Sequence, residues 1–118
     1  VYAVLIGIDG YSLGSQLSGC VSDAKAMMEY LMSTLHIPEG NIQCLLHSRD
    51  VASVKDDPTR QNIIDNLRAL SKKQRVQYII IYFAGHGSIY LNSDYCEDGI
   101  ESYGSSHALC PADRGETS

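Results

Sequence analysis

The sequence contains no long apolar run and no excess of positive charge. Its longest uninterrupted apolar stretch falls far short of the roughly 18 residues that a membrane-spanning helix needs. No stretch combines the basic, apolar and small-residue zones of a signal peptide. Lys and Arg number 9 against 14 Asp and Glu, a formal net charge of -5. We therefore expect a soluble, cytoplasmic protein that binds neither nucleic acid nor membranes.

Several cofactor-binding motifs are also absent. The cysteines are widely scattered, without a C-x-x-C pair or the close ligand spacing of a structural zinc site: Cys20, Cys44, Cys96 and Cys110. The glycines near the N-terminus lack dinucleotide-binding spacing, and no Walker lysine follows them. We expect reduced thiols and no cofactor that the chemistry requires.

The sequence does contain short apolar runs that alternate with amphipathic segments. Residues 2–8 (YAVLIGI) are too few for a helix and are typical of a strand buried on both faces. The apolar positions in residues 24–35 follow one helical face, with Ser22 or Asp23 as the predicted N-cap. Residues 42–46 (IQCLL) predict a second strand.

The same alternation continues toward the C-terminus. Thr59 is a plausible N-cap for a second helix, whose apolar stripe ends near Leu70. Residues 76–83 (VQYIIIYF) are β-branched and aromatic and predict a central strand, and residues 89–91 and 108–110 predict a small hairpin. Strands alternating with helices predict a single α/β domain with a parallel sheet.

Ligands of open parallel sheets bind beyond the carboxyl ends of the strands, where the strand order reverses. With the order 2-1-3, the loops after the first and third strands face each other, and His86 lies opposite Cys20 and Asp23. Gly85 and Gly87 flank this histidine and allow a substrate backbone to approach. A histidine in this setting is suited to proton transfer.

Plainer interpretations remain open at this point. His86 also fits a loop histidine that hydrogen-bonds a carbonyl. Cys20, Cys96, Cys110 and several serines are candidate nucleophiles. Each cysteine also fits a small buried apolar residue, and no G-x-S-x-G elbow is present for a serine.

Acidic residues gather near the C-terminus, in a pattern that suits a calcium site or a solvated loop: Asp94, Glu97, Asp98, Glu101 and Asp113.

Five segments together resemble a metacaspase of the fungal kind over nearly the whole chain. They are YAVLIGI, LSGCVSDA (17–24), TRQNII (59–64), YFAGHGS (82–88) and ALCPAD (108–113). The resemblance implies a caspase-like three-layer sandwich. Its mainly parallel sheet has the order 2-1-3, continues into strands beyond this chain, and carries helices on both faces.

The resemblance also implies a cysteine endopeptidase with a His/Cys dyad that cuts proteins after Arg or Lys. His86 matches the catalytic histidine, and the Gly87 N–H would help to hold the oxyanion. Cys20 and Asp23 match residues of the specificity pocket, in which Asp23 would attract a cationic side chain.

Two positions depart from the family pattern. Ala84 stands where the family commonly has Ser in the substrate pocket, which removes one hydroxyl contact. Glu101 stands where the family usually has an Asp that binds calcium. The resemblance thus implies calcium as a cofactor only through Glu101.

The family's nucleophile lies in an Asp-x-Cys-x-Ser-Gly motif, which this chain does not contain before Ser118. We therefore interpret residues 1–118 as a partial caspase-like peptidase domain that needs its C-terminal remainder as a partner and is inactive alone. Without the next strand, residues 76–83 would form an exposed apolar edge that favours self-association.

Two alternatives are retained. The chain would also fit a non-catalytic caspase-like scaffold that keeps a vestigial histidine. A receiver-like α/β domain fits the strand order, but its phosphoacceptor site needs clustered acids and a lysine, whereas residues 84–87 read Ala-Gly-His-Gly.

Overall fold

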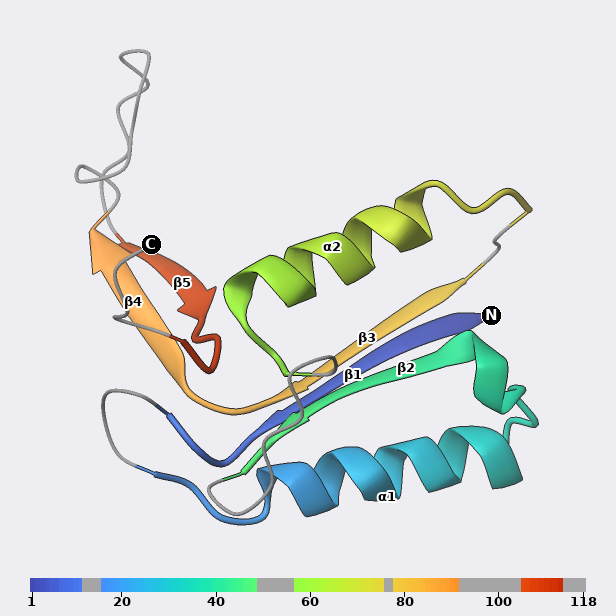
Figure 1. The fold of residues 1–118 in the computed structure, drawn as a ribbon, viewed down its shortest axis with the longest axis horizontal. Coiled ribbons are helices and arrows are strands. Elements are labelled where there is room, and N and C mark those ends of the chain that lie inside the picture. Colours follow the sequence, from blue (N-terminus) through green and yellow to red (C-terminus); the bar gives the residue numbers. More distant parts are fainter. Residues whose placement is uncertain (12–15, 49–56, 76–77, 92–104, 114–118) are drawn as a thin grey trace.

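The computed structural model describes residues 1–11, 16–48, 57–75, 78–91 and 105–113. The helices are α1 (Cys20–Ser33) and α2 (Arg60–Ser71), with a short 3-10 turn, η1 (Glu39–Asn41). The strands are β1 (Tyr2–Ile8), β2 (Ile42–His47), β3 (Ile79–Ala84), β4 (Gly87–Leu91) and β5 (Ser105–Leu109). Figure 1 shows their arrangement.

β1 is the central strand of a three-stranded parallel sheet with the order β2-β1-β3. Leu5 lies opposite Cys44 on one side and Tyr82 on the other. The side chains of residues 3–6 and Ile8 are buried, as expected of a strand covered on both faces. The predicted α/β class and 2-1-3 order are confirmed.

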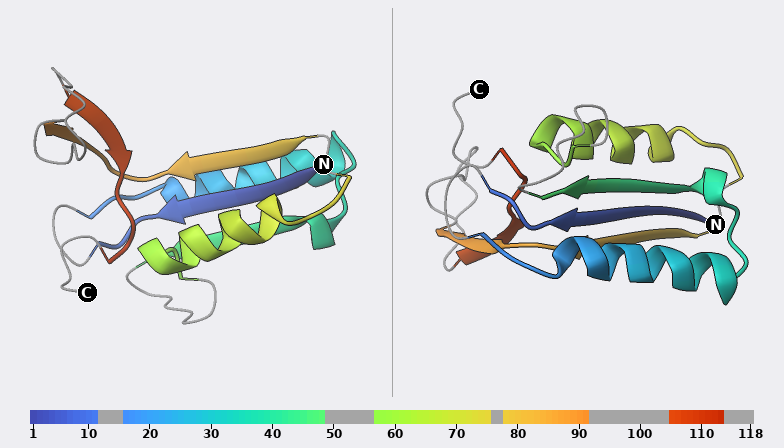
Figure 2. Two further views of the ribbon diagram at one scale, coloured as in Figure 1. Left: turned by 90° about the horizontal axis from the view of Figure 1, so that it is seen from above. Right: turned by 60° about the horizontal axis from the view of Figure 1, so that its bottom comes forward.

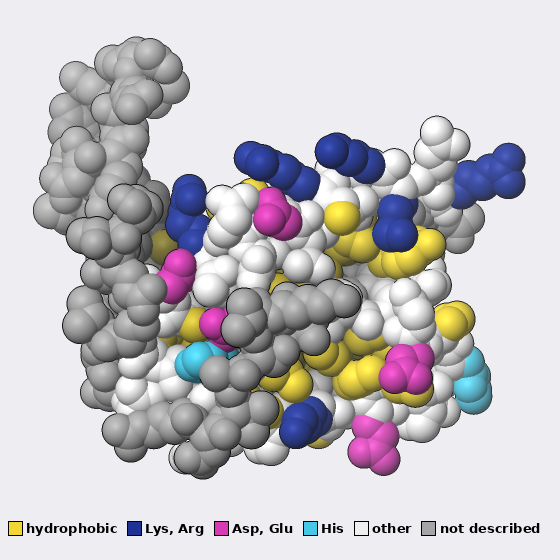
Figure 3. Space-filling view, viewed as in Figure 1, with side chains coloured by type: hydrophobic (Ala, Val, Ile, Leu, Met, Phe, Trp, Pro, Cys, Tyr) yellow, Lys and Arg dark blue, Asp and Glu magenta, His cyan; other side chains and the backbone are white. Residues whose placement is uncertain are grey.

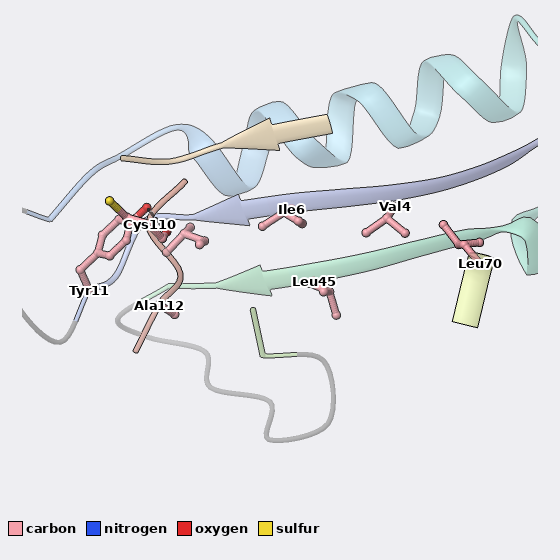
Figure 4. Packing of buried hydrophobic residues seen from close by; sticks show 8 residues of the cluster. Val4, Ile6, Tyr11, Leu45, Leu70, Cys110 and Ala112 are labelled. Atoms are coloured by element: carbon pink, nitrogen blue, oxygen red, sulfur yellow. Dashed lines mark hydrogen bonds between the residues drawn. The ribbon is translucent and has the colours of Figure 1, made fainter. Parts of the chain in front are cut away.

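The two helices cover opposite faces of this sheet, which gives three layers (Figure 2). Odd-numbered residues of β1, including Leu5, pack with Leu31 of α1. Val4 and Ile6 face the other way and form a cluster with Leu45 and Leu70, the last of these from α2. Figure 4 shows how this second cluster continues past the end of β1. The predicted helices on both faces are confirmed.

The N-cap of α2 and the hairpin near the C-terminus were both predicted from local sequence patterns. The Thr59 side chain accepts a hydrogen bond from the Asn62 N–H at 3.2 Å, so the predicted N-cap is confirmed. β4 and β5 pair antiparallel, as predicted for the late hairpin. β3 begins at Ile79 rather than at residue 76; residues 76–77 lie outside the described ranges.

α1 begins at Cys20, earlier than the predicted start at Ala24, and its N-cap is Gly19 rather than Ser22 or Asp23. Gly19 has a φ of 95°, a left-handed conformation that suits glycine. The earlier start depends on the carboxylate of Asp9, just after β1, which accepts a hydrogen bond from the Cys20 N–H. None of the helices in the described ranges has the length and apolar character needed to cross a membrane.

β3 forms one edge of the three-stranded sheet and is incompletely covered. Ile80 and Tyr82 pack against the cluster beneath α1. Ile79 and Ile81 face the other side, where α2 lies over β1 and β2 (Figure 2), and they remain 44% and 54% exposed. An apolar edge strand of this kind is a template for pairing with another chain.

We predict that the isolated 118-residue chain self-associates through β3. Ile81→Lys should shift it toward monomer, because a charge on an edge strand opposes strand addition. Size-exclusion chromatography with light scattering measures this shift. Met32→Lys, which places the same charge on α1, is the matched control and should leave the association unchanged. A monodisperse monomer of the unaltered chain would contradict the prediction.

Candidate active site

Two loops lie together at the carboxyl edge of the parallel sheet. β1 and β3 are paired neighbours, and Gly7 lies opposite Ala84 near their ends. Because parallel strands end at the same edge, the loop that leads into α1 and the loop that leads into β4 adjoin there (Figure 1). This is the position that the sequence predicted for the site.

Gly7 brings α1 directly against β1. A Cβ at this position would lie 2.7 Å from the Cys20 carbonyl oxygen and 2.9 Å from the Ala24 Cβ, so no other residue fits without a backbone shift. Gly7 also pairs with Ala84 on β3. The first turn of α1 and the end of β3 therefore adjoin the same residue.

The carboxylate of Asp9 caps α1 from outside the helix. Its Oδ1 accepts a hydrogen bond from the Cys20 N–H at 2.8 Å, and its Oδ2 accepts one from the Val21 N–H at 3.4 Å. These N–H groups have no partner within the helix, and a negative charge is favourable at a helix N-terminus. The Ser22 hydroxyl instead donates to the Gly19 carbonyl at 3.0 Å.

The first turn of α1 carries both predicted pocket residues. Asp23 is exposed, and Cys20 is partly buried. Burial raises the pKa of the Cys20 thiol, and the nearby charges of Asp9 and Asp23, with a hydrogen bond to Asp9, raise it further. A thiol that resists ionisation is a poor nucleophile, so the local environment favours a pocket role for Cys20.

His86 lies between β3 and β4 and is held by two other residues. Its N–H donates to the Tyr11 hydroxyl at 2.6 Å, and its carbonyl accepts from the Cys110 N–H at 3.0 Å. The rings of Tyr11 and His86 lie 4.8 Å apart between centroids, at an interplanar angle of 52°. His86 is partly buried, with its backbone tied to two distant segments.

The two glycines beside His86 have different surroundings. A Cβ on Gly85 would come within 2.5 Å of the Tyr11 hydroxyl and 2.9 Å of the Phe83 ring, so Gly85 makes room for Tyr11. Gly87 is exposed and lies opposite Leu109 in the β4–β5 ladder. The His86 carbonyl and the Gly87 N–H belong to the same trans peptide and point in opposite directions. Because this carbonyl accepts a hydrogen bond from Cys110, the Gly87 N–H points away from β5.

The remaining candidate residues are placed less centrally. Cys110 is 1% exposed and belongs to the core cluster, so it fits the interpretation as a small buried apolar residue. Cys96 and Glu101 lie outside the described residues. Asp113 accepts a hydrogen bond from the Arg60 N–H at 2.9 Å, at the start of α2. Within the described ranges, no three His, Cys, Asp or Glu side chains gather as metal ligands.

Sequence reasoning missed Tyr11 as a partner of His86. Its single signal in the sequence was its place three residues beyond a buried strand that was expected to end at the site. It also missed the pairing of His47 with Asp57, whose Nδ1 and Oδ1 atoms lie 2.6 Å apart and tie the end of β2 to the segment before α2.

The raised pKa of Cys20 leads to a prediction. Alkylation of Cys20 by iodoacetamide, followed against pH by peptide mass spectrometry, should have a higher midpoint in the folded chain than in the unfolded chain. Asp23→Asn should lower the folded midpoint, because the Asp23 charge opposes thiolate formation. Glu29→Gln is the matched control.

The sign of the accompanying stability change follows from linkage. Since the folded chain holds this proton more tightly, the stabilisation from Cys20 is fully present below the thiol pKa of the unfolded chain. It declines above that pKa and is lost as the pH rises through the raised pKa of the folded chain. A folded midpoint at or below the unfolded one would contradict both statements.

Comparison with known proteins identifies the family. A family model described as the metacaspase, peptidase C14 domain matches residues 2–118. The chain is 37% identical to Metacaspase-3 of Arabidopsis thaliana over 112 residues, which cover 94% of this chain and 29% of that protein.

Fungal and protozoan relatives match as well. Identity is 31% to Metacaspase-1A of Aspergillus oryzae and 28% to Metacaspase-1 of Plasmodium falciparum, in each case over 94% of this chain. These matches cover 25% and 18% of the respective relatives, so the chain spans about a quarter or less of their lengths. The chain, with its β2-β1-β3 sheet between two helices, belongs to the metacaspase family of the peptidase C14 domain.

Proposed function

We propose that this chain is the histidine-bearing part of a cysteine endopeptidase that cleaves proteins after Arg or Lys. The observation that carries the proposal is the placement of His86 at the sheet edge where the first turn of α1, with Cys20 and Asp23, adjoins the end of β3. Membership of a peptidase family makes proteins the substrate class.

His86 acts as general base and then as general acid in this proposal. It takes the proton of a cysteine thiol, the thiolate attacks the scissile carbonyl carbon, and the proton passes to the nitrogen of the departing amine as the C–N bond breaks. Water then hydrolyses the thioester and restores the thiol. We assign the thiol to the Asp-x-Cys-x-Ser-Gly motif that the family resemblance implies in the C-terminal remainder of the domain. The raised pKa of Cys20 and the burial of Cys110 are consistent with this assignment.

The backbone around His86 suits stabilisation of the tetrahedral oxyanion. The Gly87 N–H points away from β5, on the side left open by the β4–β5 ladder. One such donor is typically worth about 3 kcal/mol of transition-state stabilisation. Gly87 is exposed, so a substrate carbonyl can reach this N–H.

Negative charge at the start of α1 suits a cationic side chain before the scissile bond. The Asp9 carboxylate already accepts two helix N–H groups, whereas Asp23 is exposed one turn further on. On the face shown in Figure 3, Lys and Arg side chains lie mainly along α2. Asp23 is thus the proposed charge that pairs with Arg or Lys. Ala84, at the end of β3, is the proposed neighbour of Asp23 in this pocket and offers no hydroxyl.

Calcium takes no part in the steps above. Within the described ranges no three His, Cys, Asp or Glu side chains gather, and the carboxylate of Asp113 accepts a hydrogen bond from the Arg60 N–H at the start of α2. Glu101 remains the proposed calcium contact, outside the described ranges.

Two features support proposals about the setting of the domain. Cys20 and Cys110 are free thiols, which suits a reducing compartment such as the cytoplasm. The exposed edge of β3 suits the C-terminal remainder of the same domain as the neighbouring strand.

Substitution of His86 tests the dyad. In the full-length enzyme, His86→Asn should lower kcat/KM for a peptide ending in Arg by about a thousandfold or more, because the thiol loses its base. Release of a fluorogenic group, with and without calcium, measures this rate. His36→Asn, a change at an exposed histidine, is the matched control. A folded full-length protein that cleaves no peptide would favour the non-catalytic scaffold.

Substitution of Asp23 tests the pocket separately. Asp23→Asn should lower kcat/KM for Arg and Lys peptides by about a hundredfold, or roughly 3 kcal/mol, because the substrate cation loses its paired charge. Glu29→Gln removes an exposed charge from the same helix and should have little effect. Equal activity of the Asp23 variant and the wild type would place the specificity charge elsewhere.

A further inference from the structure

Burial and backbone hydrogen bonds hold Tyr11 in place independently of its contacts with His86. It lies just beyond β1, is 5% exposed, and belongs to the core cluster with Cys110 and Ala112 (Figure 4). Its N–H donates to the Gln16 Oε1 at 2.9 Å, and the Gln16 Nε2 donates to its carbonyl at 2.8 Å. This double contact fixes the Tyr11 backbone, so its side chain projects from an anchored position.

The Tyr11 hydroxyl lies at the end of the β4–β5 ladder, between the residue before β4 and the residue after β5. The register pairs Gly87 with Leu109, which places His86 opposite Cys110. Residues at such a position normally exchange two direct hydrogen bonds. Here one is direct, from the Cys110 N–H to the His86 carbonyl at 3.0 Å.

The second bond of this pair runs through Tyr11. The His86 N–H donates to the Tyr11 oxygen at 2.6 Å, and the Tyr11 hydroxyl donates to the Cys110 carbonyl at 3.2 Å. The hydroxyl thus bridges the two segments and restrains the position of the His86 backbone. Gly85 leaves the space that the hydroxyl occupies.

The same side chain contacts the imidazole. The two rings lie 4.8 Å apart at 52°, within the range of favourable tilted aromatic contacts. Tyr11 therefore contacts His86 at both its backbone and its ring, while its own backbone is tied to Gln16. A catalytic base requires such restraint, because a misplacement of about 1 Å can lower a rate by a hundredfold.

We propose that Tyr11 is the positioning residue of His86, setting the backbone and ring of the catalytic base through its hydroxyl and its aromatic face. The inference rests on the proposed role of His86. It assigns no proton transfer to Tyr11. The expected signature is a loss of turnover without a matching loss of substrate binding.

The test uses the full-length enzyme with a fluorogenic Arg peptide. Tyr11→Phe keeps the ring and removes the hydroxyl, and should lower kcat by about ten- to a hundredfold with KM within about twofold of the wild type. Tyr30→Phe, at a half-exposed tyrosine on α1, is the matched control and should retain wild-type kcat. In spectra of carbon-13-labelled histidine, the His86 ring signal should shift in Tyr11→Phe and stay in place in Tyr30→Phe.

Gln16→Ala is a second variant, at an exposed residue whose loss should leave the fold intact. It should lower kcat less than Tyr11→Phe does. The double variant should have the same kcat as Tyr11→Phe alone, because Gln16 acts through the Tyr11 hydroxyl. Should Tyr11→Phe fail to fold, an unchanged kcat and an unmoved His86 signal in Gln16→Ala would overturn the inference.

The outcomes separate this inference from the proposed function. Wild-type kcat in a folded Tyr11→Phe enzyme, beside an inactive His86→Asn enzyme, would overturn the role of Tyr11 and leave the dyad standing. Full activity of His86→Asn would overturn both. A Tyr11→Phe enzyme with raised KM and unchanged kcat would assign Tyr11 to substrate binding and also overturn the inference.

Discussion

The burial of β1 on both faces, with a strand paired along each of its edges, is the constraint on which the rest of the structure depends. Its alternate side chains contribute to both core clusters, one beneath α1 and one beneath α2. Gly7 lets the α1 backbone approach, and its pairing with Ala84 fixes where β3 ends. The position of each site segment is therefore set by its contact with β1.

Two residues in the short segment after β1 organise both halves of the candidate site. Asp9 supplies the carboxylate that begins α1 and so places Cys20 and Asp23. Two residues later, Tyr11 supplies the hydroxyl that holds His86 against Cys110. Both polar groups lie at the end of the most buried strand, where the backbone positions are restrained by packing. A site built in this way gains precision from the core rather than from its own loops.

Contacts between residues close in sequence could be predicted, whereas contacts between distant residues could not. The Thr59 cap is a contact with Asn62, three residues away, and the sequence predicted it correctly. The predicted caps of α1, Ser22 and Asp23, were wrong because the actual acceptor, Asp9, precedes Cys20 by 11 positions and lies directly after β1. The contact between Tyr11 and His86 joins residues 75 positions apart and has no local pattern.

The sequence by itself determined the α/β class, the order of its elements and the family, because apolar periodicity, caps and short motifs are local properties of the chain. The tertiary structure alone decided where α1 starts, why Gly85 is needed, and what restrains His86. The Asp9–Cys20 contact that starts α1 forms when α1 packs against the end of β1. The contacts of Tyr11 with Gly85 and His86 form only after β1 has paired with β3 and the hairpin has closed. Such contacts are products of packing, and no spacing along the chain encodes them.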